Sequence, residues 1–79
     1  VSRARQYGVT VAFGTDAGVY QHGRNGEELG LMKKQGMSDR DVLASATTVA
    51  AKVLGMESQI GKLAPGYSAD IIAVAGNPL

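Results

Sequence analysis

Asp16 is the side chain in this sequence whose type and position are best suited to chemistry. It follows residues 9–13, an apolar run rich in β-branched residues that is typical of a buried strand. In α/β proteins, the carboxyl ends of strands open into a crevice bordered by loops, so a polar residue there can face a ligand. The alternative is that the Asp16 carboxylate caps its own loop by hydrogen bonding to nearby backbone amides.

The loop after Asp16 contains two more polar candidates, His22 and Arg24, between the glycines at positions 18, 23 and 26. Long loops beside a strand end are often functional. His22 could contact a ligand or could equally face solvent, and Arg24 could bind a carboxylate or lie on the surface. A phosphate-binding loop at Gly14 and Gly18 is disfavoured, because no Gly-Lys-Ser/Thr follows.

The elements around these residues predict an alternation of helix and strand. Residues 2–7 suit a helix end, Gly8 stops it, and the strand at 9–13 follows. Asn25, three residues before Glu28, predicts the start of a helix that ends at Gly36.

A second, longer helix is predicted from Ser38 to Leu54. Ser38 is suited to be its N-cap, with Asp41 three residues later, and Gly55 closes it. Apolar residues recur at spacings of three and four along it: Val42, Leu43, Ala46, Val49, Ala50, Val53 and Leu54. Beyond it, strands at 60–64 and 69–74, joined by a turn at Pro65 and Gly66, predict a β-hairpin.

The length, composition and charge of the chain limit the classes of protein to which it can belong. Its 79 residues make one small domain at most, and the chain has no cysteine for disulfides or thiolate metal sites. A formal charge of +1 with scattered basic residues predicts no nucleic-acid or membrane partner, and a cytoplasmic location is the default. Because the sequence begins with Val1 and runs almost at once into a strand, we expect a piece of a longer chain.

Three segments together resemble the metal-dependent amidohydrolase superfamily, in particular its imidazolonepropionase-like and prolidase-like members. The resemblance covers nearly the whole chain and is specific in the order and spacing of the segments. They are Gly14-Thr15-Asp16-Ala17 after a strand, Ala46-Thr47 with Ala50-Ala51 and Leu54-Gly55 on a helix, and Ile60-Gly61-Lys62-Leu63-Ala64-Pro65-Gly66 with Ala69-Asp70-Ile71-Ile72 and Gly76-Asn77-Pro78-Leu79 behind it.

The resemblance implies an α/β fold, with residues 1–57 as the last strand and helices of a (β/α)8 barrel. Residues 58–79 would then be a β-hairpin of a small β-sandwich, and the isolated chain would be a small α+β module. In this family Asp16 matches the aspartate that binds a divalent metal, commonly zinc, and moves the proton of the attacking water. His22 would contact the substrate, a small molecule whose amide, dipeptide or cyclic amide carbon–nitrogen bond is hydrolysed.

The sequence also departs from the family pattern, because it contains one histidine and lacks the family's other metal ligands. A catalytic zinc takes three protein ligands, so we expect no metal site and no activity in one isolated copy. Thr47-Thr48-Val49 also departs where relatives carry asparagine at the third position. The alternative function is a free-standing structural or binding module. For either function, strands whose edges lack a neighbouring strand predict a homo-oligomer.

Overall fold

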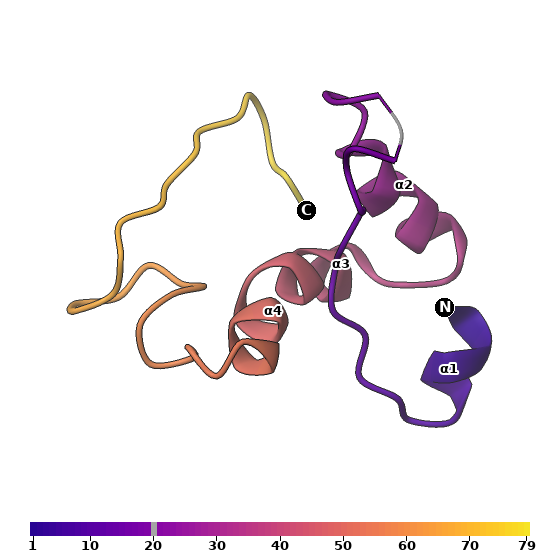
Figure 1. Ribbon diagram of the computed structural model, residues 1–79, viewed down its shortest axis with the longest axis horizontal. Coiled ribbons are helices and arrows are strands. Elements are labelled where there is room, and N and C mark those ends of the chain that lie inside the picture. Colours follow the sequence, from indigo (N-terminus) through magenta and orange to yellow (C-terminus); the bar gives the residue numbers. More distant parts are fainter. Residues whose placement is uncertain (20) are drawn as a thin grey trace.

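In the computed structural model, which describes residues 1–19 and 21–79, four helices make up the regular structure (Figure 1). They are α1 (Ser2–Gln6), α2 (Glu27–Lys34), α3 (Asp39–Ala46) and α4 (Thr48–Val53). The described residues form no β-strand. The α/β and α+β classes, the barrel strand and the β-hairpin are therefore wrong for this chain. None of the helices in the described ranges has the length and apolar run needed to cross a membrane.

Residues 9–13 are extended but unpaired, which is why the predicted strand is absent. A strand is stabilised by ladders of hydrogen bonds to its neighbours. Among the residues described, this segment makes two backbone bonds to helices and none to a strand. The Val9 N–H donates to the Ala4 carbonyl of α1 at 3.1 Å, and the Phe13 N–H to the Ser45 carbonyl of α3 at 2.9 Å. In Figure 1 the indigo-to-purple segment passes across α3 with no neighbouring strand beside it. The apolar pattern predicted the extended conformation, but it could not indicate whether a neighbouring strand would pair with this segment.

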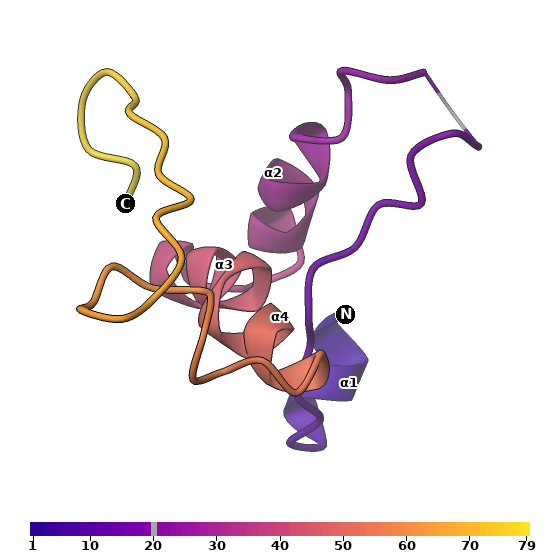
Figure 2. The same ribbon diagram turned by 60° about the vertical axis from the view of Figure 1, so that its left-hand side comes forward.

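The predicted hairpin also fails because its two arms do not pair. The turn itself forms, since the Tyr67 N–H donates to the Ala64 carbonyl at 3.1 Å. One further bond closes the loop, from the Ser68 N–H to the Gln59 carbonyl at 2.8 Å. Beyond it, residues 69–79 form an irregular arm that first leaves the helices and then turns back, so that Pro78 lies near α2 and α3 (Figure 1). Figure 2 shows the same arm from another side.

The predicted helix ends at Gly36 and Gly55 are confirmed. The Gly36 N–H donates to the Lys33 carbonyl at 2.9 Å and the Met37 N–H to the Met32 carbonyl at 3.2 Å. This is the Schellman pattern, which requires a left-handed residue, and Gly36 has a φ of 96°. The predicted start at Asn25 is wrong, because Gly26 is the N-cap of α2 and no side chain caps it.

The predicted helix from Ser38 to Leu54 is interrupted at Thr47, where φ is −126° and ψ is −92°. Ser38 caps its start as predicted, accepting from the Asp41 N–H at 3.1 Å. At the break, the Thr47 hydroxyl donates to the Leu43 carbonyl at 2.7 Å. A β-branched residue with a hydroxyl that bonds the preceding turn competes with helix continuation, so α3 ends here and α4 begins.

The core is small and lies where α2, α3 and the extended segment meet. Its buried side chains are Met32, Met37 and Val42, and the partly buried ones packed against them are Val11, Phe13 and Leu29. Val11 and Phe13 lie two residues apart, so an extended backbone points both the same way. The segment that leads to Asp16 is therefore held by packing as well as by its bond to α3.

Candidate functional site

Asp16 lies three residues beyond the point at which the extended segment is fixed to α3. The Phe13 N–H donates to the Ser45 carbonyl, which is free because α3 ends at Ala46. Ser45 itself is buried, with 1% of its surface exposed, and its hydroxyl donates to the Val42 carbonyl at 2.6 Å. Sequence analysis missed Ser45, although a lone polar residue within an alanine-rich apolar stripe was a visible signal.

The backbone of Asp16 adopts a left-handed conformation, with a φ of 52°. It is the one non-glycine residue with positive φ in the described part of the chain. Its carbonyl accepts a hydrogen bond from the Val19 N–H at 3.2 Å, so the chain turns sharply after the extended segment. Aspartate is one of the few residues that tolerate this conformation, at a cost of about 1 kcal/mol.

The Asp16 carboxylate is exposed and has no hydrogen-bond or ion-pair partner among the residues described. The alternative interpretation, an Asx-type cap made by this carboxylate, is therefore not seen within residues 1–19 and 21–79. A carboxylate with both oxygens open to solvent can accept a proton, bind a cation or receive hydrogen bonds. The Asp16 carboxylate is thus open to solvent and accessible to a ligand.

His22 lies in the same loop, is exposed, and makes no metal-binding cluster with Asp16. Across the described ranges, no group of three or more histidine, cysteine, aspartate or glutamate side chains is close enough to hold a metal ion. A catalytic zinc site needs three protein ligands. The described residues therefore do not fit a complete metal centre, and Asp16 offers one carboxylate ligand at most.

Arg24 is held by Glu27 at the start of α2. The Arg24 Nε and Nη2 atoms donate to the two Glu27 carboxylate oxygens, each at 3.1 Å. The hydrogen bond and then the charge of Arg24 lower the pKa of Glu27, and the same contacts raise the pKa of Arg24. Both side chains are exposed, and the contact holds the Arg24 guanidinium at the start of α2.

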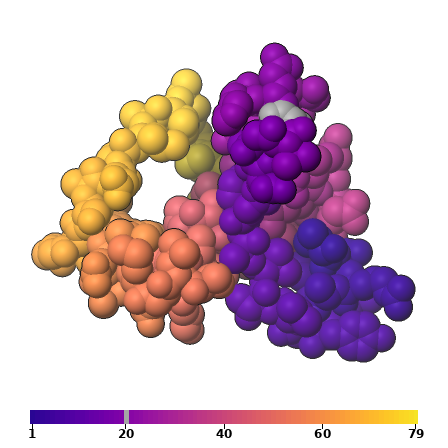
Figure 3. Space-filling model, in the orientation of Figure 1, coloured from indigo at the N-terminus to yellow at the C-terminus, as the bar shows by residue number. Residues whose placement is uncertain are grey.

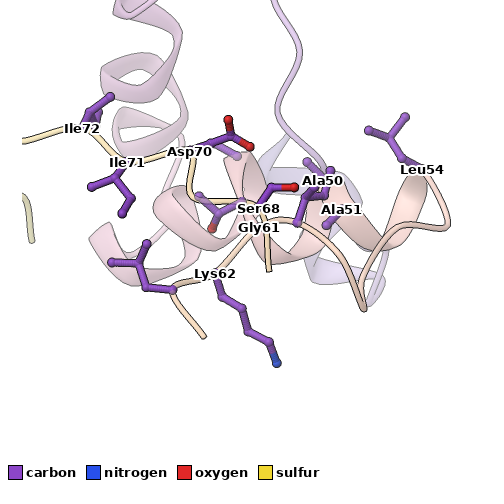
Figure 4. Close-up of a pocket in the computed structure, with 13 residues that line it drawn as sticks. Ala50, Ala51, Leu54, Gly61, Lys62, Ser68, Asp70, Ile71 and Ile72 are labelled. Atoms are coloured by element: carbon purple, nitrogen blue, oxygen red, sulfur yellow. The ribbon is translucent and has the colours of Figure 1, made fainter. Parts of the chain in front are cut away.

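A separate groove of about 460 Å³ lies between α4 and the chain that follows it. Figure 4 shows Ala50, Ala51 and Leu54 of α4 on one side and Ile71 and Ile72 of the C-terminal arm on the other. Neither Asp16 nor His22 lines this groove. The candidate chemical site and this groove are thus distinct.

Comparison with known proteins places these features in a family. The model of the amidohydrolase family matches residues 1–79, the full length of the sequence given. The chain therefore belongs to the amidohydrolase family, as the three sequence segments indicated.

Individual relatives show how much of such a protein this chain represents. A 5-methylthioadenosine/S-adenosylhomocysteine deaminase from Symbiobacterium thermophilum is 39% identical over an alignment 85 residues long, which covers 94% of this chain and 20% of that protein. An imidazolonepropionase from Rubrobacter xylanophilus is 49% identical over 37 residues, 47% of this chain and 9% of that protein. A second deaminase of the same name, from Teredinibacter turnerae, is 34% identical over 84 residues and matches 94% of this chain. The chain thus spans about a fifth of the length of the deaminases.

Proposed function

We propose that this chain supplies the catalytic carboxylate of a longer amidohydrolase that hydrolyses carbon–nitrogen bonds in small molecules. The observation that carries the proposal is the placement of Asp16. Its exposed carboxylate has no described partner and stands on a left-handed turn directly after an anchored extended segment. Membership of the amidohydrolase family supports a hydrolytic role for such a carboxylate.

In this proposal Asp16 is one ligand of a divalent metal, zinc by preference, and accepts the proton of the attacking water. When bound, such a metal lowers the pKa of its water towards about 7, which makes a nucleophile available at neutral pH. The remaining ligands would come from outside these 79 residues, since the described residues do not assemble three. The contribution of this chain is a carboxylate held at a defined place by the Phe13 anchor.

His22 is proposed as a substrate contact, because it is exposed in the loop that follows Asp16. The substrate class is an amide, a dipeptide or a cyclic amide. The names of the relatives, a deaminase and an imidazolonepropionase, support small molecules as substrates. We also propose a cytoplasmic enzyme that forms homo-oligomers. Its segments 1–57 and 58–79 would be separate units, because all four helices fall within the first.

The test is Asp16→Asn in the complete reading frame that contains this sequence. We expect kcat/KM to fall by about a thousandfold or more, with a lower content of bound metal, because the amide neither accepts the proton nor binds a cation well. Glu57→Gln is the matched control, an exposed carboxyl-to-amide change away from the Asp16 turn, and should leave both quantities unchanged. Activity of Asp16→Asn within about threefold of the native protein would overturn the proposal.

A further inference from the structure

We propose that Thr47 is a positioning residue for the Asp16 carboxylate. Its hydroxyl ends α3 in a way that leaves the Ser45 carbonyl free to hold the extended segment that leads to Asp16. Thr47 would act through Ser45 and Phe13 rather than by contact with the substrate. This role rests on the proposed function, since it requires Asp16 to be the catalytic carboxylate.

The hydrogen bonds at the end of α3 show how Thr47 interrupts the helix. In a continuous α-helix, the Thr47 N–H would donate to the Leu43 carbonyl. Here the Thr47 hydroxyl donates to that carbonyl at 2.7 Å, and the Thr47 N–H donates instead to the Ala44 carbonyl at 3.1 Å. The φ and ψ of Thr47, −126° and −92°, lie outside the helical range. The hydroxyl thus occupies the acceptor on which the next helical bond depends.

The Ser45 carbonyl is the acceptor that this interruption sets free. In a continuous helix it would point along the helix axis and accept from the Val49 N–H. In the part of the chain that the structure describes, it accepts from the Phe13 N–H at 2.9 Å, and no bond from Val49 on α4 forms. Phe13 and Val49 are therefore alternative donors to one carbonyl, and the conformation of Thr47 selects between them.

The Phe13 bond determines how firmly Asp16 is held. Val11 and Phe13 pack against the core cluster that includes Val42 of α3, and Figure 3 shows the purple extended segment lying on the pink and magenta helices. Asp16 follows Phe13 by three residues, and the Val19 N–H closes its turn at 3.2 Å. Without its bond to α3, the segment keeps only side-chain packing at this point, so the carboxylate would sample more positions. A misplacement of about 1 Å can lower a catalytic rate by about a hundredfold.

The first experiment follows the two competing amides by hydrogen exchange at single-residue resolution. It uses the complete reading frame that contains this sequence, where the remaining polypeptide can compete for the Phe13 N–H. Thr47→Val keeps the branched Cβ and removes the hydroxyl. We expect the Phe13 amide to exchange at least about tenfold faster and the Val49 amide more slowly, because the Ser45 carbonyl changes its donor. A general loss of stability would speed both amides, so opposite shifts identify the change of donor.

The second experiment measures turnover of the same variants, on the substrate used to compare Asp16→Asn with the native protein. Thr47→Val and Thr47→Ala should lower kcat by about ten- to a hundredfold and leave KM within about twofold, because the carboxylate is misplaced while the binding contacts remain. Thr47→Ser keeps the hydroxyl and should retain the native kcat. Thr48→Ala is the matched control, since Thr48 is exposed and its hydroxyl makes no hydrogen bond among the residues described.

Three results would overturn the role of Thr47. The first is a Phe13 amide that stays equally protected in Thr47→Val, since another acceptor would then hold the segment. The second is a shift of the Phe13 and Val49 amides in the same direction. The third is a native kcat for Thr47→Val when Asp16→Asn is inactive. Full activity of Asp16→Asn would instead overturn the proposed function, and the exchange experiment would still show whether Thr47 controls the bond to Phe13.

Discussion

At the scale of single residues, the bidentate contact between Arg24 and Glu27 is the interaction with a defined pH response. Hydrogen bonding and the charge of Arg24 hold the pKa of Glu27 below its ordinary value of 4.5. A carboxyl whose pKa is lowered by folding stabilises the folded state above its unfolded pKa. This contribution is lost as the pH falls through the lowered folded value. Both side chains are exposed, so solvent screens the pair and the effect on global stability is small.

We therefore predict that Arg24→Gln raises the pH at which Glu27 titrates, with little change in overall stability. Removing the guanidinium takes away both the hydrogen bonds and the charge that favour the ionised carboxylate. The measurement is the carboxyl carbon chemical shift of Glu27 followed by NMR from pH 2 to pH 6. Arg40→Gln, another exposed arginine, serves as the control. An unchanged Glu27 midpoint in Arg24→Gln would show that the contact does not persist in solution.

Part of the structure around single residues was predictable, because caps and turns depend on residues that are close in the sequence. The serine cap at Ser38 was predicted from its spacing to Asp41 and is confirmed, whereas the catalytic role of Asp16 stays a prediction. The left-handed turn at Asp16 and the anchor at Ser45 were not predictable. The anchor depends on how the extended segment meets a helix more than thirty residues later, and hydrophobic periodicity does not indicate such long-range contacts.

At the scale of elements, Gly61 is where the loop after α4 approaches the helix most closely. A Cβ built on Gly61 would lie 2.9 Å from the Ala51 Cβ and 2.9 Å from the Thr47 carbonyl oxygen. The Gly61 φ is 95°, in the region that favours glycine. The close approach therefore requires glycine for both space and backbone conformation, and Gly61 is the point at which the loop lies against α4.

We predict that Gly61→Ala destabilises the chain by about 2 to 4 kcal/mol. The strain of a left-handed alanine adds to a steric clash with the Thr47 carbonyl, a backbone group that cannot move aside. Gly66→Ala is the matched control. Gly66 has a similar φ of 85° but nothing within 4 Å of its Cβ position, so only the strain of about 1 kcal/mol applies. The two free energies of unfolding are compared by urea denaturation. Equal losses would show that the loop does not dock on α4.

Helices were easier to predict than strands, because a helix is stabilised within its own segment and a strand by a second segment. The ends of α2 and α4 follow from Gly36 and Gly55, and a helix makes its hydrogen bonds within itself. A strand exists only when another strand pairs with it, so residues 9–13 and 69–74 could show strand composition without forming one. The break at Thr47 was missed because the apolar stripe continues through it.

At the scale of the whole molecule, the described residues lack some of the ligands that a catalytic metal site requires. The family model matches all 79 residues, yet the sequence spans about a fifth of the deaminases it resembles. The core cluster of buried side chains consists of Met32, Met37 and Val42 among the residues described, which is small for a chain of this size.

We therefore predict that the isolated 79-residue chain, with zinc added, shows no hydrolysis of amide, dipeptide or cyclic amide substrates above a zinc-only blank. Asp16 and at most His22 can offer ligands from the Asp16 loop, and a catalytic zinc needs three. Without a third ligand the metal is not held, and the water near Asp16 keeps its ordinary acidity. The complete reading frame, assayed in the same way, is the positive control. Turnover by the pure chain that a chelator abolishes would contradict the prediction and would mean that two copies share one site, each contributing its Asp16.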